Sequence, residues 1–254
     1  MGEFAHIERS RDGQVEHLVL NRPEVRNALN EEMIAEVTAW ASRAASDPDL
    51  RAVVIVGAGL SFCAGADLAW MAKMAGYTRE DNLRDARAAA AMFEAINTLP
   101  VPVIARVHGA ALGGGAGLAA VADIVVADES ATFGFTEVKL GLIPAIIAPY
   151  VLAKIGESAA RELFLTGRRF SADRAHEIGL VHAVMAADQL DRAVQQYLAD
   201  ILASGRDAVA AAKALLRQIS YRSIGEVGPL TAEAIATRRV SSEAQERMRA
   251  FLKK

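Results

Sequence analysis

The sequence predicts an α/β fold with mostly parallel strands, and three observations support this prediction. Short apolar runs rich in β-branched residues recur up to about residue 187, and such runs suit strands buried on both faces. Stretches with the apolar spacing of helices separate these runs. From Asp188 onward the strand signals stop and only helical patterns remain. We therefore expect an α/β core over residues 1–187 and a helical region over residues 188–254.

The expected strands are of two kinds. Residues 4–9 and 15–20 form a hairpin around the turn Arg11-Asp12-Gly13. The later runs are apolar without alternation, which is the pattern of a strand covered on both faces. These further strands are expected at residues 52–56, 101–107, 123–127 and 181–184.

The first expected helix follows Asn30, whose side chain suits an N-cap, and Glu31 and Glu32 favour the helix dipole in the first turn. The helix is expected to stop near Ser46-Asp47-Pro48. Ser171 is a second expected cap. Further helices are expected at residues 83–99, just after 113–115, and at 157–165, 172–177, 188–203, 207–219 and 231–252.

The overall composition is that of a globular protein. Of 254 residues, 52% are hydrophobic and 23% are charged. The formal net charge of −3 lacks the basic excess that nucleic-acid-binding proteins carry. We therefore expect no nucleic-acid partner.

Cysteine content and hydropathy bear on the compartment. Cys63 is the only cysteine, so no intrachain disulfide is possible and a reducing compartment is expected. The N-terminus lacks the basic start and apolar run of a signal peptide. The longest uncharged stretches, residues 109–122 and 140–153, have about 14 residues, fewer than the roughly 18 that span a bilayer. We expect a soluble, cytoplasmic protein without a membrane partner.

Several familiar catalytic signatures are absent from the sequence. It contains neither a phosphate-binding P-loop nor the G-x-S-x-G nucleophile motif. Gly57-Ala-Gly59 starts a dinucleotide-site pattern, but Phe62 stands in the place of its third glycine. The five histidines have no metal-ligand spacing, so no metal site is expected. Cys63 has no base nearby in sequence, which favours a buried, inert thiol.

Two loops rich in small residues follow expected buried strands. Residues 61–68 come after the run that ends at Gly57, and residues 108–117 open a short helix. Small residues let a ligand approach the backbone, and free N–H groups at a helix N-terminus attract negative charge. Either loop alone is also explained by tight backbone packing. Together, at the carboxyl ends of neighbouring strands, they predict a cradle for one developing oxyanion.

Glu137 is a carboxylate within an otherwise largely apolar stretch, residues 133–144. Apolar surroundings raise the pKa of a carboxyl group and suit it to general acid/base catalysis. The alternative is a surface glutamate paired with Lys139.

These segments resemble the crotonase (enoyl-CoA hydratase/isomerase) superfamily. The similar motifs are Cys-Ala-Gly-Ala-Asp-Leu at 63–68, the glycine triplet at 113–115, and Phe-Gly-x-x-Glu-x-x-Leu-Gly-x-Ile-Pro at 133–144. The resemblance extends from Leu20-Asn21-Arg22-Pro23 to the C-terminus. It implies a spiral of ββα turns followed by C-terminal helices for oligomerisation, assembled as a homotrimer or a homohexamer.

The resemblance also assigns roles to positions of this chain. It implies that the oxyanion is held by the backbone N–H groups of Ala66 and Gly114, with Glu137 as the acid/base. Coenzyme A is part of the substrate thioester, and no separate cofactor is implied. The residues expected near coenzyme A are Arg26, Ala28, Ala64, Asp67 and Leu68, with Phe251 and Lys254 contacting it in a neighbouring subunit.

One position departs from the family pattern. Typical members carry a second glutamate two residues beyond the glycine triplet, and here that position is Gly117. Three interpretations remain open: a hydratase with one glutamate, a Δ3,Δ2-enoyl-CoA isomerase, and a non-catalytic acyl-CoA-binding or RNA-binding member. The intact loops and the absence of basic excess argue against the third.

Residues 65–71, 81–86 and 135–144 are similar to those of bacterial 3-methylglutaconyl-CoA hydratases of leucine degradation and their isoprenoid-acid relatives. This similarity favours the first interpretation, in which water is added across the Cα=Cβ bond of an enoyl-CoA of fatty acid metabolism. We expect the small Gly117 to leave space in the substrate pocket for such a branched acyl group.

Overall fold

The largest element of the fold is a six-stranded sheet. In sheet order its strands are β1 (Ile7–Asp12), β2 (Val15–Leu20), β3 (Ala52–Gly57), β4 (Val103–Val107), β6 (Ile124–Asp128) and β9 (Ala183–Met185). The computed structural model describes residues 4–220 and 222–253. β1 is antiparallel to β2, and each later pair of neighbours is parallel. The prediction of mostly parallel strands is confirmed.

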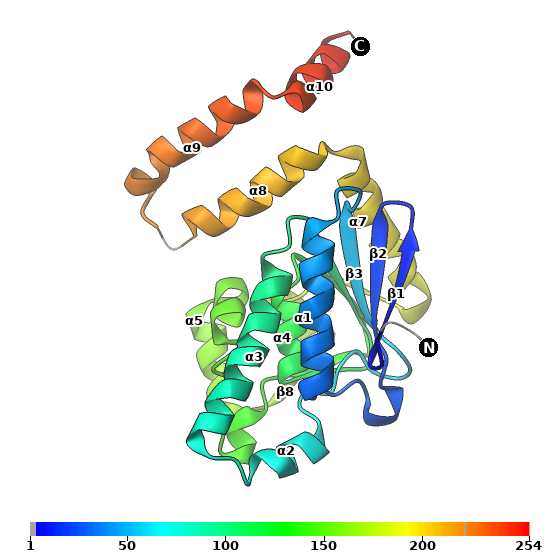
Figure 1. Cartoon of the computed structure of the whole chain (residues 1–254), viewed down its shortest axis with the longest axis vertical. Helices are drawn as coiled ribbons and strands as arrows, with labels where there is room; N and C mark the ends of the chain where they lie inside the picture. Colours follow the sequence, from blue (N-terminus) through cyan, green and yellow to red (C-terminus); the bar gives the residue numbers. More distant parts are fainter. Residues whose placement is uncertain (1–3, 221, 254) are drawn as a thin grey trace.

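Helices cover both faces of this sheet. The helices that precede residue 204 are α1 (Glu31–Ser46), α2 (Leu68–Met74), α3 (Arg79–Asn97), α4 (Gly114–Val121), α5 (Ala148–Thr166), α6 (Ala172–Glu177) and α7 (Leu190–Ala203). α1 packs against α3 over one face, and α7 lies on the other (Figure 1). The predicted cap of α1 is confirmed, because Oδ1 of Asn30 accepts a hydrogen bond from the N–H of Met33 at 2.9 Å.

The sheet is apolar on both sides, as its strands predicted. Val53 and Ile55 of β3 join the core beneath α1, α3 and α4, whereas Ala52 and Val54 join a second core with α7. Successive side chains of a strand point to opposite faces, so a strand buried on both needs a continuous apolar run.

A second, three-stranded sheet was not predicted. It consists of β5 (Ala110–Leu112), β7 (Thr132–Gly134) and β8 (Arg169–Ser171), in that order. Strands of three residues are too short to show a period in sequence. Cys63 pairs with Ala111 of β5, so the loop after β3 is fixed to this small sheet.

Several helix boundaries differ from the predictions. α2 was not expected, and α5 is longer than the predicted 157–165, with a bend at Gly156, where φ is +71°. The single helix predicted over 231–252 is wrong: the chain forms α9 (Ile224–Arg239) and α10 (Ser242–Leu252). The break occurs because Ser241 caps the second helix, its Oγ accepting a hydrogen bond from the N–H of Ala244 at 3.3 Å.

The C-terminal helices extend beyond the sheet-containing body. α8 (Arg206–Ile219), α9 and α10 lie at the opposite end of the long axis from α2 (Figure 1). Lys213 of α8 anchors them to the body through Asp123, 2.7 Å away, and the carbonyl oxygen of Val101. The three 3-10 helices are η1 (Pro23–Val25), η2 (Glu137–Leu140) and η3 (Ala187–Gln189).

Within the described residues, no helix has both the length and the apolar character of a membrane-spanning segment.

Candidate active site

The first of the two predicted loops follows β3 and is held by backbone hydrogen bonds to Leu29. The N–H of Leu29 donates to the carbonyl oxygen of Gly65 at 2.7 Å, and the N–H of Asp67 donates to the carbonyl oxygen of Leu29 at 2.9 Å. Ala66 lies between these two bonds. Its own N–H has no hydrogen-bond acceptor among residues 4–220 and 222–253.

The second loop follows β4 and leads into α4. The N–H of Gly113 donates to the carbonyl oxygen of Gly134 at 2.8 Å, and that of Gly117 donates to Gly113 at 3.0 Å in the first helical turn. Gly114 is the first residue of α4, and its N–H likewise lacks an acceptor in the described part of the chain. The first N–H groups of a helix carry a partial positive charge and have no partner inside the helix.

The two loops touch through their backbones. Gly65 has a φ of +101°, and a Cβ atom there would lie 2.9 Å from the carbonyl oxygen of Leu112. A Cβ on Gly113 would lie 3.9 Å from the Cα of Gly65. This close approach brings the segments that carry the free N–H groups of Ala66 and Gly114 together.

Glu137 lies beside these loops, at the start of η2, shortly after β7. Its Oε1 is 3.4 Å from the position of a Cβ on Gly113. Its Oε2 is buried and has no hydrogen-bond partner among the described residues. Burial raises the pKa of the Glu137 carboxyl above its ordinary value. The alternative of a surface glutamate paired with Lys139 is wrong, because Oε2 of Glu137 is buried and has no partner among the described residues.

A cavity of about 950 Å³ opens next to Ala66. Five of the seven predicted coenzyme A positions line it, namely Arg26, Ala28, Ala64, Asp67 and Leu68. Phe251 is not among the residues that line this cavity. Phe251 is 77% exposed on α10, at the far end of the molecule (Figure 1), and Lys254 lies outside the described residues.

The expectation that Gly117 leaves space for the acyl group is wrong. Gly117 is buried in α4, and a Cβ there would lie 2.3 Å from Cγ2 of Ile147 and 3.1 Å from Cε1 of Phe93. Ile147 and Phe93 are themselves buried. The place of a second glutamate side chain is therefore filled by apolar atoms.

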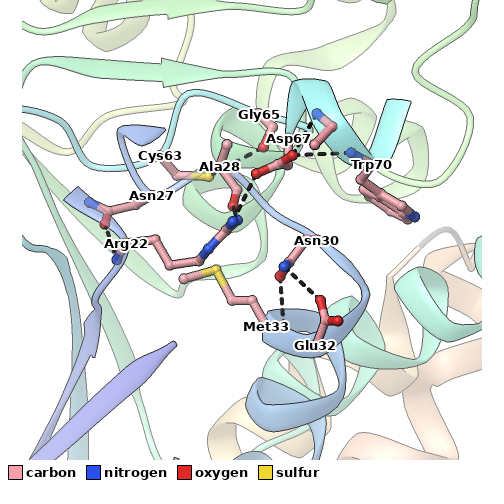
Figure 2. A network of polar contacts seen from close by, with 11 residues as sticks. Arg22, Asn27, Ala28, Asn30, Glu32, Met33, Cys63, Gly65, Asp67 and Trp70 are labelled. Atoms are coloured by element: carbon pink, nitrogen blue, oxygen red, sulfur yellow. Dashed lines mark hydrogen bonds and ion pairs between the residues drawn. The ribbon is translucent and has the colours of Figure 1, made fainter. Parts of the chain in front are cut away.

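Sequence reasoning missed Arg22, which connects two parts of the site (Figure 2). Its Nη2 lies 2.9 Å from Oδ2 of Asp67, and its Nη1 donates to the carbonyl oxygen of Ala28 at 2.6 Å. The only signal in the sequence was the position of Arg22 within the Leu20-Asn21-Arg22-Pro23 motif, which gives no role to the side chain.

Asp67 is the other half of this ion pair. Its Oδ1 accepts hydrogen bonds from the N–H groups of Ala69 and Trp70 and so caps α2 (Figure 2). Although burial acts to raise it, the hydrogen bonds from Trp70, Arg22 and Ala69 hold the pKa of the Asp67 carboxyl below its ordinary value. Asp67 therefore lines the cavity as a fully engaged carboxylate.

The remaining reactive groups do not suggest other chemistry. Burial raises the pKa of the Cys63 thiol to about 12, which keeps it protonated and unreactive. Over the described ranges, no group of His, Cys, Asp and Glu side chains has the arrangement of a metal site.

Comparisons with known proteins identify the family of this chain. The family Enoyl-CoA hydratase/isomerase matches residues 10–254. A crotonyl-CoA hydratase of Syntrophomonas wolfei is 32% identical over 257 residues, which cover 99% of this chain and 96% of that protein.

Two solved structures illustrate the similarity of fold. An enoyl-CoA hydratase from Shewanella pealeana has a TM-score of 0.95 at 36% identity, covering 99% of this chain and 94% of the other. Pseudomonas aeruginosa AtuE has a TM-score of 0.94 at 35% identity, covering 98% and 96%. The chain has the crotonase fold, and it belongs to the enoyl-CoA hydratase/isomerase family.

Proposed function

We propose that this protein is a hydratase that adds water across the Cα=Cβ bond of an enoyl-CoA thioester, with Glu137 as its single acid/base. The observation that carries this proposal is the combination of three unpartnered polar groups at one place. They are the N–H groups of Ala66 and Gly114 and the buried Oε2 of Glu137, none of which has a hydrogen-bond partner among the described residues. A buried carboxylate oxygen without a partner is rare, and one bound substrate would satisfy it together with the two free N–H groups.

The proposed role of the two N–H groups is to hold the thioester oxygen as it becomes an enolate. Two donors fixed by the backbone need no reorganisation when negative charge develops. Loss of one such donor typically slows a reaction by about a hundredfold or more.

In the proposed reaction Glu137 moves one proton. Its carboxylate takes a proton from water as the water oxygen bonds to Cβ, and the double-bond electrons move to the thioester oxygen. The carboxylic acid then returns that proton to Cα, and the enolate collapses to the thioester. The net change is the addition of H and OH, and Glu137 ends as it began. Its raised pKa supports both the acceptance and the return of the proton.

The apolar filling opposite Glu137 supports a mechanism with one carboxylate. Ile147 and Phe93 occupy the space next to Gly117, so no second carboxylate from this position reaches the substrate. The acyl group would meet an apolar wall there, and Glu137 alone would direct the water.

For the substrate we propose 3-methylglutaconyl-CoA or a related branched enoyl-CoA, with a place in leucine degradation. The support is the resemblance of the residues around 65–71 and 135–144 to hydratases of such esters. Arg26 and Arg169 also line the cavity and supply positive charge for the anionic groups of a substrate. The single buried cysteine supports our further proposal that the protein works in the cytoplasm.

The second candidate is a Δ3,Δ2-enoyl-CoA isomerase, because one carboxylate suffices to move a proton between carbons. To separate the candidates, crotonyl-CoA, 3-methylglutaconyl-CoA and a 3-enoyl-CoA are each supplied and the products are weighed by mass spectrometry. We expect a gain of about 18 Da, the mass of water, with at least one 2-enoyl substrate. Unchanged mass with a moved double bond would favour the isomerase. Tight binding without conversion would favour a non-catalytic acyl-CoA-binding role.

The role of Glu137 has its own test. Glu137→Gln keeps the size of the side chain but removes the proton acceptor, so we expect turnover to fall by at least about a hundredfold. Binding of a saturated acyl-CoA, measured by calorimetry, should survive. Activity close to that of the unchanged protein would remove Glu137 from the mechanism.

We also propose that the protein works as a homotrimer or homohexamer through the helical region 188–254. The support is a group of exposed apolar side chains on or next to its last helices, including Ile224, Ile235, Val240, Phe251 and Leu252. In such an assembly Phe251 and Lys254 would contact coenzyme A bound to a neighbour. Light scattering of the purified protein tests the assembly, and a monomer would contradict it.

A further inference from the structure

Asp67, which follows Ala66 in the first loop, forms an ion pair with Arg22. We propose that Arg22 is a positioning residue, which holds the Ala66 N–H in the direction needed to bind the thioester oxygen. This inference rests on the proposed function of the Ala66 N–H as one of the two donors. Arg22 itself acts through Asp67 and Ala28.

Two backbone segments meet at Ala66, and Arg22 bonds to both. One segment is 28–29, where Nη1 of Arg22 donates to the carbonyl oxygen of Ala28 at 2.6 Å. The other begins at Asp67, whose Oδ2 is 2.9 Å from Nη2. Figure 2 shows the guanidinium between these two acceptors. The planar group thus fixes the spacing of the two segments.

The same two segments are paired through their backbones on either side of Ala66. Leu29 accepts a hydrogen bond from the N–H of Asp67 and donates one to Gly65. Because the residues before and after it are held to Leu29, Ala66 has little freedom, and its N–H direction follows the relative placement of the segments. Any shift between them would turn that N–H.

Burial strengthens the ion pair between Arg22 and Asp67. The side chain of Arg22 is 13% exposed and that of Asp67 is 6% exposed. Charges in such a place are weakly screened, and a partner left alone there is strongly unfavourable. The network is therefore expected to hold one geometry.

The two oxygens of Asp67 have separate roles, which makes the proposal testable. Oδ1 caps α2, whereas Oδ2 receives Arg22. Asp67→Asn retains an oxygen for the cap but loses the ion pair. Arg22→Met removes the guanidinium while keeping an unbranched side chain, and Arg22→Lys restores charge without the fork.

The chain offers a matched control at the other end of the strands. The side chain of Glu16 in β2 is 5% exposed, its Oε1 accepts a hydrogen bond from Nε1 of Trp40 at 2.6 Å, and its Oε2 lies 3.5 Å from Nη1 of Arg11. Glu16 pairs with Val53 near the start of β3, whereas the loop that carries Ala66 follows the end of that strand. Glu16→Gln thus weakens a similar ion pair away from the oxyanion loops, and it should lower stability without changing turnover per folded molecule.

The experiment compares kcat and KM for hydration of the best enoyl-CoA in these variants, together with thermal unfolding. We expect Arg22→Met and Asp67→Asn to lower kcat about 10- to 100-fold with KM changed less than about threefold, because displacing a catalytic group by about 1 Å has effects of this size. Arg22→Lys should recover part of the loss. A purely structural role predicts lower melting temperatures with unchanged kcat, as in Glu16→Gln, and would overturn the proposal.

A second measurement does not depend on turnover. Infrared spectra of crotonyl-CoA labelled with 13C at the thioester carbonyl are recorded on the Glu137→Gln variant with and without Arg22→Met. Hydrogen bonds from an oxyanion hole lower the carbonyl frequency of the bound ester. We expect the lowered band to move back toward the free value when Arg22 is changed, and an unmoved band contradicts the inference. Failure of the proposed hydratase function would instead appear as no hydration by the unchanged protein.

Discussion

The two loops that carry the free N–H groups are held in place by different means. The loop after β3 depends on side chains: Arg22 and Asp67 form an ion pair beneath Ala66, and Asn27 donates hydrogen bonds to the carbonyl oxygens of Ala58 and Ser61. The loop after β4 depends on the absence of side chains, since Gly109 and Gly115 press against neighbouring backbone. Removal of a polar side chain should therefore disturb the loop after β3, whereas an added side-chain atom should disturb the loop after β4.

The difference follows from the position of each loop in the fold. The loop after β3 lies next to the surface cavity, where charged side chains reach it from the segment 22–30. The loop after β4 leads into α4, which is buried along nearly its whole length. In a close-packed interior, van der Waals contact sets the distance between segments, so a single added carbon atom forces them apart.

The strongest test of this comparison is Gly115→Ala. A Cβ at Gly115 would lie 2.1 Å from the carbonyl oxygen of Cys63, which is backbone and cannot rotate away. We expect the free energy of unfolding in urea to fall by about 3 kcal/mol or more. Gly225→Ala is the control, because Gly225 is the second residue of α9 and the added carbon has no atom within 4 Å apart from its chain neighbours and its own helix backbone. That variant should change stability by at most about 1 kcal/mol. Equal effects in both would contradict the comparison.

A smaller effect is expected where the neighbour is a side chain. A Cβ at Gly117 meets Cγ2 of Ile147 at 2.3 Å, and a side chain can shift more easily than backbone. We expect Gly117→Ala to lower the free energy of unfolding by about 1–3 kcal/mol.

Ile147→Ala provides the matching half of a double-mutant cycle. Alone it should be destabilising by about 2–5 kcal/mol, because it leaves a cavity. The double variant should be more stable than the sum of the two losses by about 1–2 kcal/mol, because the added carbon enters that cavity. Additive losses would show that Ile147 does not fill the space beside Gly117.

The large sheet could be predicted from sequence because its strands are buried on both faces. The run 52–56 is apolar throughout, and β3 covers Ala52–Gly57. The small sheet could not be predicted, since β5, β7 and β8 have three residues each and derive their pairing from tertiary contacts. The break between α9 and α10 was missed because Ser241 was not recognised as a cap within a continuous helical pattern.

The sequence predicted that the segments carrying the candidate site residues lie together, but it did not show which side chains support those segments. Ala66, Gly114 and Glu137 were expected from motifs, and these segments do lie together. The role of Arg22 was not evident, because its partner Asp67 is 45 residues away. The sequence also did not show that Ile147 and Phe93 fill the space beside Gly117, because a glycine does not identify the residues that pack against it.

The smallest expected effect concerns the stability contribution of Glu137, which lies beside Gly113 of the second loop. Its pKa is raised above 4.5 in the folded protein because burial disfavours the charged form. The folded chain then holds the proton more tightly than the unfolded chain. The stability that this carboxyl contributes is fully present below its pKa in the unfolded chain, and it is lost as the pH rises through its pKa in the folded protein. At neutral pH the buried carboxylate therefore destabilises the fold.

Glu137→Gln should thus stabilise the protein at neutral pH while it abolishes turnover. We expect the stability difference between the variant and the unchanged protein, from urea unfolding, to be near zero at about pH 4 and to grow in favour of glutamine toward about pH 8. Glu157→Gln is the control, since the side chain of Glu157 is 77% exposed and its change should give no such trend. A difference that is flat with pH would mean that Glu137 ionises in the fold as it does in water. A stability difference that rises with pH would mean that the ionised, unpartnered carboxyl of Glu137 lowers the stability of the folded protein.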